Sequence, residues 1–456
     1  MTDVCEYVFD PDGDDGGTKT SVKSAWECPL PAHDKAERCV LHMDPEGRAR
    51  LGVSDDEVRE AFVRTVEGAE PGEACRFVGA NFGETVVNAD SLGRNAGAID
   101  LRNASFEGKF EINCDAVEAD LMLDNSELEI FSAPSTVFEG GVSLQGCGFD
   151  GKVNLDSATF EDRAIFKKAR FSLGAEFSEA VFEGDANFRL SKQSGGQTNF
   201  KDAVFRGNAL MGRVNYDNAD FTRAEFGSDT DFSGASFGDE TKFQYCAFHG
   251  GVDFGSSDFN GNTVFRGAKF ADRASFEDAS FQGWASFSDV EFRSDASFES
   301  AWFKSELKMA TEPGSDGVID FSGARMGQAS MESDRSVALD FTRARVGNVS
   351  ISGDGRVNNP LDNVRFIETE FNGFRFSEYA DHLAEKDYVI HEVAGEEGEE
   401  IPPARLEKTY GLAAEGAEGN ADGIASKFAK KEAKYRRKKY RKDGRLLRYL
   451  LDFLPI

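Results

Sequence analysis

Phenylalanine recurs along this chain at intervals that alternate between five and six residues. The pattern is most regular from Phe221 to Phe303, where the intervening Phe residues stand at positions 226, 232, 237, 243, 248, 254, 259, 265, 270, 276, 281, 287, 292 and 298. The same spacing runs upstream from Phe160 to Phe188. A surface helix repeats every 3.6 residues and a half-buried strand every two. Because an eleven-residue double step fits neither, the pattern predicts a repeat architecture.

A small residue stands two positions before most of these Phe residues. In an extended segment, residues i and i−2 share a face, so the small residue and the Phe both point inward while Lys269, between Ala268 and Phe270, points out. Each short strand then contributes one large and one small side chain to a narrow interior and ends in a turn. Four such sides close one coil of about 22 residues, and coils stack about 4.8 Å apart through backbone hydrogen bonds.

The small-x-Phe unit, as in Ala235-Ser236-Phe237, resembles the centre of the repeat that defines the pentapeptide-repeat family. The resemblance covers roughly residues 75–376. It implies an all-β solenoid, a right-handed quadrilateral β-helix made of double units of about 11 residues. Every second unit carries one extra residue, which implies a slightly rectangular or bulged coil.

The spacing loosens in three places. Leu, Ile and Val replace Phe over 89–147, and we interpret 189–199 as an excursion from the coil. Two related units 20 residues apart, at Phe321 and Phe341, indicate further coils with looped-out connections over 305–365.

Composition narrows the function classes. The chain of 456 residues has 41 Phe against 3 Trp, and a formal net charge of −30. That charge excludes generic attraction to nucleic acid and is typical of adaptation to concentrated salt, as in halophilic proteins. No secretory signal is visible and no segment approaches 18 consecutive apolar residues. We therefore expect a cytoplasmic protein.

The ends of a solenoid need caps, because each exposes an open core. Ser54 and Glu57 form a capping box, and Val58, Phe62 and Val66 follow at helical spacing. The sequence predicts that this helix, within 51–70, covers the first coil.

The preceding segment, 1–50, contains a candidate zinc site. Cys39 and His42 form a compact C-x-x-H pair, and Cys5 and Cys28 complete a set of three cysteines and one histidine, hereafter the CCCH cluster. Such sets hold structural zinc with tetrahedral geometry in segments too small to fold alone. We expect one structural zinc ion here.

Other interpretations of this segment remain open. The thiols can be unligated, and His33 can replace His42; a disulfide is disfavoured by the cytosolic setting. Asp10, Asp12 and Asp14 suggest a calcium loop, but Asp15 stands where an EF-hand needs Gly. The remaining cysteines differ, since Cys75, Cys147 and Cys246 occupy the small inward position before a Phe, and Cys114 is ambiguous.

The C-terminal region breaks with the repeat. An acidic linker is predicted over 377–403, followed by a helical hairpin over 404–456, with helices at Ala404–Glu418 and from Ala421 to about Lys442. Residues 427–448 hold 12 Lys or Arg and 2 acidic residues. An apolar end follows, so the tail combines a basic cluster with an end suited to lie at a membrane surface.

Three interpretations of this tail stand side by side: a cap on the last coil with a solvated basic face, a nucleic-acid arm, or a segment beside a membrane. The tail also resembles the connector of archaeal pentapeptide-repeat proteins that continue into a two-helix ion-channel pore. No pore follows in this chain, so we expect membrane apposition, at the inner face, or an ion-channel-like partner. The candidate contact residues are Lys434, Arg436, Arg437, Lys438, Lys439, Arg441, Lys442, Leu447, Leu450, Leu451 and Phe453.

Catalytic motifs are lacking in the sequence. Of the five His, His249, His382 and His391 have no Cys or paired acid at ligand or triad spacing. No phosphate-binding Gly loop, G-x-S-x-G or H-E-x-x-H occurs. We therefore expect no enzyme, and no catalytic residue is assigned.

Three functions are compatible with these features. The first is a rigid interaction scaffold, membrane-apposed or regulating a membrane partner through its basic tail. The resemblance also implies a second, an acidic DNA mimic that inhibits a type II topoisomerase. The third is a structural spacer with a salt-adapted surface. Fold analogy does not choose among them.

Overall fold

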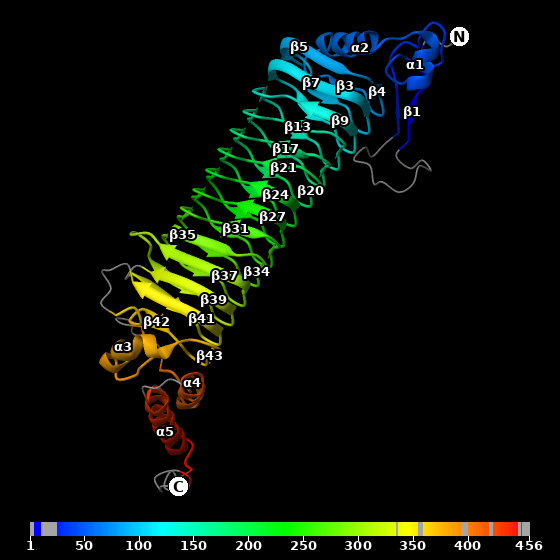
Figure 1. The fold of residues 1–456 in the computed structure, drawn as a ribbon. Helices are drawn as coiled ribbons and strands as arrows, with labels where there is room; N and C mark the ends of the chain where they lie inside the picture. Colours follow the sequence, from blue (N-terminus) through cyan, green and yellow to red (C-terminus); the bar gives the residue numbers. More distant parts are fainter. Residues whose placement is uncertain are drawn as a thin grey trace. The chain divides into compact units, whose positions relative to one another are not determined.

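The computed structural model describes residues 4–10, 25–333, 336–353, 359–393, 400–418, 423–445 and 448 (Figure 1). The chain divides into two compact units, Met1–Glu240 and Thr241–Ile456. One strand, β27 (Ser236–Lys242), contains the division between them. Each unit is built on a β-solenoid of short parallel strands, and each is described by itself below.

The first unit opens with an antiparallel pair, β1 (Val8–Phe9) and β2 (Trp26–Glu27), and two helices, α1 (Pro45–Leu51) and α2 (Asp55–Glu67). Its solenoid strands are β3 (Ala74–Arg76), β4 (Asn81–Phe82), β5 (Thr85–Leu92), β6 (Ala98–Asp100), β7 (Ser105–Val117), β8 (Asp120–Met122), β9 (Glu127–Ser132), β10 (Val137–Phe138), β11 (Val142–Ser143), β12 (Gly148–Phe149), β13 (Val153–Asn154), β14 (Thr159–Phe160), β15 (Ala164–Ile165), β16 (Arg170–Phe171), β17 (Gly174–Glu176), β18 (Val181–Phe182), β19 (Ala186–Asn187), β20 (Lys192–Gln193), β21 (Gln197–Asn199), β22 (Val204–Phe205), β23 (Ala209–Leu210), β24 (Asn215–Asp220), β25 (Glu225–Phe226) and β26 (Thr230–Asp231).

The second unit ends in a 3₁₀ turn, η1 (Phe376–Tyr379), and three helices, α3 (Ala380–Glu385), α4 (Pro403–Gly416) and α5 (Ile424–Lys442). Its solenoid strands are β28 (Ala247–Phe248), β29 (Val252–Asp253), β30 (Asp258–Phe259), β31 (Asn262–Val264), β32 (Lys269–Phe270), β33 (Ala274–Ser275), β34 (Ser280–Phe281), β35 (Ala285–Phe292), β36 (Ala296–Ser297), β37 (Trp302–Thr311), β38 (Gly317–Asp320), β39 (Arg325–Ser333), β40 (Val337–Asp340), β41 (Arg345–Gly353), β42 (Val364–Arg365) and β43 (Glu370–Phe371).

Parallel pairing sets the length of a coil. Phe138 lies opposite Phe160, and Phe160 lies opposite Phe182, so each coil here takes 22 residues. Strands β10 to β13 are the four sides of one such coil. The predicted solenoid and its coil length are confirmed.

Phe side chains form stacked ladders inside the coils. In the second unit Phe276 lies 4.9 Å from Phe254 and 4.7 Å from Phe298 between ring centroids, with nearly parallel planes. It also meets Phe265 and Phe287 of a second ladder edge-to-face, at 5.4 and 5.3 Å. All five rings are 0% exposed. The interior is therefore filled by aromatic contacts of both favourable kinds.

The predicted excursion at 189–199 is wrong. Lys192 pairs with Arg170, and Gln197–Asn199 pair with the strand β17 of the preceding coil, so this segment forms regular sides with one inserted residue. Gln193 takes the place where a Phe is expected and is 4% exposed. Its Nε2 donates to the carbonyl oxygens of Gly195 and Gly196, at 3.1 and 2.6 Å. A polar residue continues the ladder because its amide is satisfied locally.

The other irregular stretches also form coils. In 89–147 aliphatic residues form a ladder of their own, with Ile99 opposite Leu121 and Leu121 opposite Val142, and this row continues in later coils as the small residues Ala164 and Ala186. The further coils predicted over 305–365 are confirmed by the long parallel strands β37, β39 and β41.

Strand turns place a left-handed residue at matching points of successive coils, as at Ser135, Ser157, Glu179, Asp202 and Arg223, with φ between 55 and 61°. Glu179 and Arg223 lie outside the Gly, Asp, Asn and Ser set that sequence rules favour for such turns. The stacking of coils therefore imposes the left-handed conformation on ordinary residues.

The N-terminal helix plugs the first coil as predicted. Ser54 Oγ accepts from the Glu57 N–H, and Glu57 accepts from the Ser54 N–H, so the capping box is present. Phe62 of α2 packs edge-to-face on Phe77 and Phe82, at 4.9 and 5.6 Å. The helix α1 was not predicted, although Asp44 caps it and Pro45 begins it.

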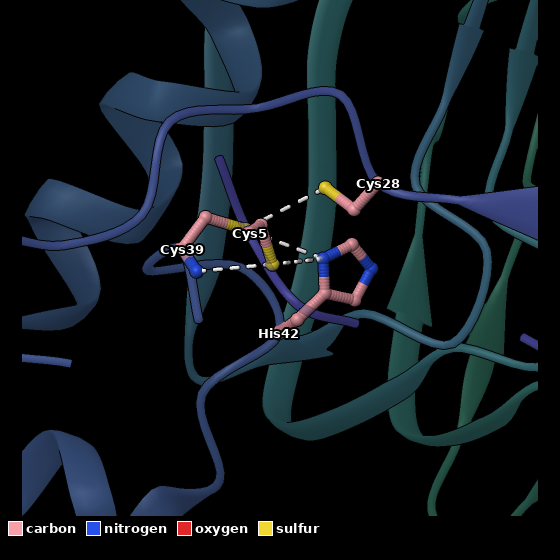
Figure 2. Close-up of side chains that lie close together, drawn as sticks. All are labelled: Cys5, Cys28, Cys39 and His42. Carbon is pink, nitrogen blue, oxygen red and sulfur yellow. Dashed lines mark hydrogen bonds between the residues drawn. The ribbon is translucent and has the colours of Figure 1, made fainter. Parts of the chain in front are cut away.

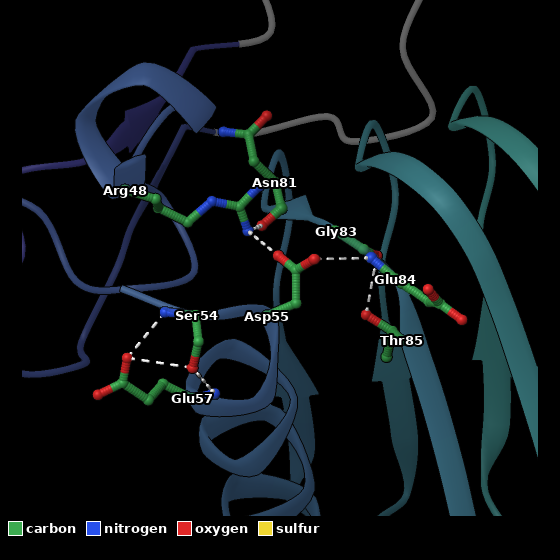
Figure 3. A network of polar contacts seen from close by, with 8 residues as sticks. All are labelled: Arg48, Ser54, Asp55, Glu57, Asn81, Gly83, Glu84 and Thr85. Carbon is green, nitrogen blue, oxygen red and sulfur yellow. Dashed lines mark hydrogen bonds and ion pairs between the residues drawn. The ribbon is translucent and has the colours of Figure 1, made fainter. Parts of the chain in front are cut away.

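Buried Arg48 joins α1 to α2 and to the first coil (Figure 3). Its Nη1 donates to the Asn81 carbonyl at 3.3 Å and lies 3.8 Å from Asp55 Oδ1. Asp55 Oδ2 also accepts from the Glu84 N–H at 3.3 Å. Gly83 lies so close that a Cβ there would overlap the Asp55 carboxylate. This polar network fixes both helices at the start of the solenoid.

The predicted acidic linker at 377–403 is partly folded. Its first residues form η1 and α3, while Glu396, Glu397 and Glu399 lie outside the described residues. The two predicted helices of the tail are present as α4 and α5, which pack together. Phe428 of α5 meets Phe376 at 5.0 Å. The C-terminal helices therefore cover the last coil, as one of the three interpretations of the tail held.

We expect Phe276→Ala to lower the free energy of unfolding by about 3–5 kcal/mol, because it opens a cavity between two ring contacts of one ladder and two of the other. Urea unfolding followed by circular dichroism measures this change. Ser275→Ala, at the adjacent outward position, is the matched control and should stay within about 0.5 kcal/mol of the parent. Equal losses from both variants would contradict a stability that rests on the ladders.

Candidate metal centre

The N-terminal segment brings the four predicted ligands together from two local structures. The β1–β2 pair sets Cys5 near Cys28, with the Cys28 N–H donating to the Tyr7 carbonyl at 3.0 Å. Cys39 and His42 lie in one turn, in which the His42 N–H donates to the Cys39 carbonyl at 3.1 Å. The Cys39 N–H also donates to Cys5 Sγ at 3.2 Å. Backbone hydrogen bonds thus pre-position the side chains.

The CCCH cluster is compact and buried (Figure 2). Its four ligand atoms all lie within 4.8 Å of one another. Cys28 Sγ is 3.9 Å from Cys39 Sγ, and His42 Nδ1 is 3.2 Å from Cys39 Sγ and 4.0 Å from Cys5 Sγ. The side chains come from residues that are between 0 and 6% exposed.

These separations fit a tetrahedral zinc ion. Zn–S bonds of about 2.3 Å and Zn–N bonds of about 2.0–2.1 Å place tetrahedral S···S pairs about 3.8 Å apart and S···N pairs about 3.6 Å apart. The Cys28–Cys39 distance of 3.9 Å matches the first value. The two His42 distances, 3.2 and 4.0 Å, bracket the second. The donor set and its spacing therefore suit zinc with all four positions filled by protein.

The electrostatics favour one ionised thiol in this cluster. The hydrogen bond from Cys28, with His42 close by, lowers the pKa of Cys39 to about 4 although burial opposes the shift. The same hydrogen bond and burial raise the pKa of Cys28, and burial raises that of Cys5. The Cys39 thiol therefore loses its proton most readily, and metal binding would also require Cys5 and Cys28 to lose theirs.

The cluster is tied to the first coil of the solenoid. With Nδ1 facing the thiols, His42 Nε2 donates to the Val78 carbonyl at 3.1 Å. Such an outer hydrogen bond fixes the ring orientation of a metal-binding histidine. The Tyr7 ring stacks on the His42 ring at 4.0 Å, and the Asn81 N–H donates to the Leu41 carbonyl at 2.7 Å.

The other candidate ligands considered in the sequence do not belong to the CCCH cluster. His33 accepts from the Lys35 N–H at its own turn and is not a member of the cluster, so the predicted substitution for His42 is wrong. Cys75, Cys147, Cys246 and the ambiguous Cys114 are all buried, as expected for small inward residues. Asp12 and Asp14 of the calcium alternative lie outside the described residues.

The second predicted contact surface is α5. Arg436 and Lys439 pair with Glu407 of α4, at 3.6 and 2.8 Å, whereas Lys434 and Lys438 are exposed. Arg441 and Lys442 are also exposed, and Arg437 is half-buried. Leu447, Leu450, Leu451 and Phe453 lie outside the described residues. Across the part of the chain that the structure describes, no helix has the length and apolar character to cross a bilayer.

Comparison with known protein families identifies the type of repeat. A family model described as pentapeptide repeats, in nine copies, matches residues 133–179, 144–192, 216–258, 243–291 and 254–302. The matched segments of the solenoid are thus pentapeptide repeats. No curated protein and no solved structure matches the chain. The matched segments include neither the CCCH cluster nor the C-terminal helices.

Sequence reasoning found the four thiol and imidazole donors but missed the residues that hold them in place. Tyr7 and Val78 act through a ring face and a backbone carbonyl, which carry no sequence signal. Gly79 has φ +68°, and a Cβ there would overlap the Tyr7 ring and hydroxyl. From the sequence alone, a single glycine before a strand does not reveal which side chain approaches it; the fold is needed to see that Tyr7 does.

We expect Gly79→Ala to displace Tyr7 from His42 and to destabilise the N-terminal cap. Two costs add: about 1–2 kcal/mol for a left-handed alanine, and about 1–3 kcal/mol for overlap with Tyr7. Thermal unfolding followed by Trp26 fluorescence measures the change. Gly52→Ala is the matched control, because Gly52 has φ +73° with nothing near its Cβ position. If both variants lose the same stability, the Tyr7 contact has no role.

Proposed function

We propose that the protein is a non-enzymatic interaction scaffold. The observation that carries the proposal is the closed interior, in which stacked rings such as Phe254, Phe276 and Phe298 are 0% exposed. A filled core leaves recognition to outward side chains and to the two ends, as in other solenoids that bind partners on extended surfaces. The chain holds 82 Asp and Glu against 52 Lys and Arg, so its polar surface is predominantly acidic.

Within this scaffold, the CCCH cluster binds one structural zinc ion through Cys5, Cys28, Cys39 and His42. Zinc in such a site supplies folding energy and no reaction, because the protein fills all four positions. The support is the tetrahedral spacing of the donors and the hydrogen bond from His42 Nε2 to the Val78 carbonyl. The ion would fix the N-terminal segment on the first coil.

We expect purified full-length protein to hold about one zinc ion per chain, measured by atomic emission. Cobalt substitution should give the intense near-ultraviolet bands of thiolate ligands. Cys28→Ser should weaken metal binding by more than about 100-fold, because a ligand thiolate is lost. A strong chelator should lower the melting temperature of the parent and leave that of the variant unchanged.

The matched control is Cys75→Ala, which removes another buried thiol of the same unit but places alanine at an inward position where the repeat normally has it. It should keep the zinc. Metal-free parent protein without thiolate bands after cobalt addition would refute the zinc assignment, and equal metal loss from Cys75→Ala would refute the ligand set.

We further propose that α5 docks the scaffold on an anionic membrane surface or on a membrane partner such as an ion channel. Its inner side is neutralised by Glu407 and Asp387, the latter 2.6 Å from Lys431, while an outer face of Lys and Arg is exposed. A row of cations is attracted to anionic lipid headgroups by about 1 kcal/mol per residue. With such docking, the location we propose is cytoplasmic and peripheral to the membrane.

The test is sedimentation with vesicles that contain phosphatidylserine. Replacing Lys430, Lys434 and Arg441 together with Gln should weaken binding more than about tenfold, since three cations leave one helix face. Replacing Lys192, Lys201 and Lys308 with Gln removes the same charge from the solenoid and should change binding little. Binding of the parent should fall as salt rises. Failure of the parent to bind at low salt would refute membrane docking.

The other functions considered for the sequence stay predictions. Inhibition of a type II topoisomerase by an acidic DNA mimic has support only from the net charge of −30, which salt adaptation explains equally well. The spacer function has the same support.

A further inference from the structure

A cleft of about 1080 Å³ lies within the second unit, between the last solenoid coils and the C-terminal helices. The coils contribute Arg343 and Arg365, and the segment after α3 contributes Lys386. Helix α4 contributes Arg405 from its first turn, and α5 contributes Lys438. Five cationic side chains from five places in the chain therefore face one cavity.

This concentration of positive charge is unusual for a protein of net charge −30. Three acidic residues also line the cleft, Asp340, Glu392 and Glu400. Part of the positive charge is already matched, because Arg365 pairs with Asp340 at 3.0 Å and Arg405 lies 3.7 Å from Glu368. Lys386 also lies 3.7 Å from Asp362, so the lining holds five cations against three acidic residues but only Arg343 and Lys438 have no carboxylate partner among the described residues.

Two of the cations, Arg343 and Lys438, are available to bind a ligand. Lys386 is not, since its Nζ donates to the Leu361 carbonyl at 2.8 Å. Arg343 is exposed and has no ion pair or side-chain hydrogen bond within the described parts of the chain. Lys438 is exposed and lies over the Tyr435 ring, 5.2 Å from its centroid, with no carboxylate partner among the described residues.

The remaining lining includes the polar Ser322, Thr342 and His391 and a group of apolar and aromatic side chains: Ile367, Val389, Val393, Ile401, Leu406 and Tyr435. Tyr435 is held in place by stacking on Tyr410 at 5.4 Å. A cavity with apolar walls and a few convergent charged groups is the usual form of a small-molecule site. Its volume suits a ligand larger than inorganic phosphate.

We propose that this cleft binds an organic phosphate of nucleotide size. The guanidinium of Arg343 and the ammonium of Lys438 hold the phosphate groups, and the apolar wall with Tyr435 receives the uncharged part. Arginine suits this role because its planar fork pairs with two phosphate oxygens. The site is separate from the CCCH cluster, and of the predicted contact residues of α5 it uses only Lys438, which stays unchanged in the variants of the membrane test.

The test is isothermal titration of full-length protein with ATP at low salt. Arg343→Gln and Lys438→Gln should each weaken binding about five- to tenfold, and the double variant more. Lys434→Gln is the matched control, because Lys434 lies one turn from Lys438 on α5 but does not line the cleft. It should bind ATP as the parent does. Inorganic pyrophosphate should bind at least tenfold more weakly than ATP.

Three results would overturn the proposal: no heat of binding from folded parent protein with millimolar ATP, equal weakening by Lys434→Gln and Lys438→Gln, or equal affinity for pyrophosphate and ATP. The second would assign binding to the general charge of α5, and the third would remove the role of the apolar wall. Vesicle binding by Arg343→Gln should be unchanged, so this test and that of membrane docking fail independently.

Discussion

The face-to-face stacking of Phe rings between coils is the constraint on which the solenoid depends. A ring such as Phe160 can stack on both Phe138 and Phe182 only if each coil returns to the same register after 22 residues. Ring pairs add about 0.5–1.5 kcal/mol beyond the burial of their area. The register in turn forces left-handed turns on residues such as Glu179, and it fixes which side chains face outward. Charge on the outer faces is therefore free to vary without cost to the core.

Sequence predicts the coils well because each coil contacts only its neighbours, so a local period carries the fold. Prediction from sequence fails where a residue other than Phe fills a Phe position of the interior. Gln193 interrupts the Phe pattern, and the sequence therefore predicts an excursion that the structure does not contain. Nothing in the chain signals that the carbonyls of Gly195 and Gly196 will accept hydrogen bonds from its amide. It also fails at the ends, where α1 and α3 depend on packing against a coil and not on the repeat.

The candidate metal centre could likewise be predicted only in part from the sequence. Ligand type and the C-x-x-H spacing of Cys39 and His42 identify the donors, since metal chemistry selects those side chains at short separations. The contacts that orient them, the Tyr7 ring and the Val78 carbonyl, become neighbours only once β1, β2 and the first coil have formed. Spacing therefore predicts which residues come together, and tertiary structure decides how the cluster is coupled to the solenoid.

A filled core also explains why the chemistry of this protein collects at the ends. Along the coils the inward positions are filled by Phe rings, by aliphatic or small residues and, at one position, by Gln193, so a cavity can form only where the repeat stops and a different element packs against it. At the C-terminal end, helices α4 and α5 cover the last coil but leave a cleft lined by Arg343 and Lys438. At the N-terminal end, the CCCH cluster sits against Val78 of the first coil. Both features lie in cap segments. Residues there do not have to stack in the Phe ladders, so their side chains can serve to bind ligands.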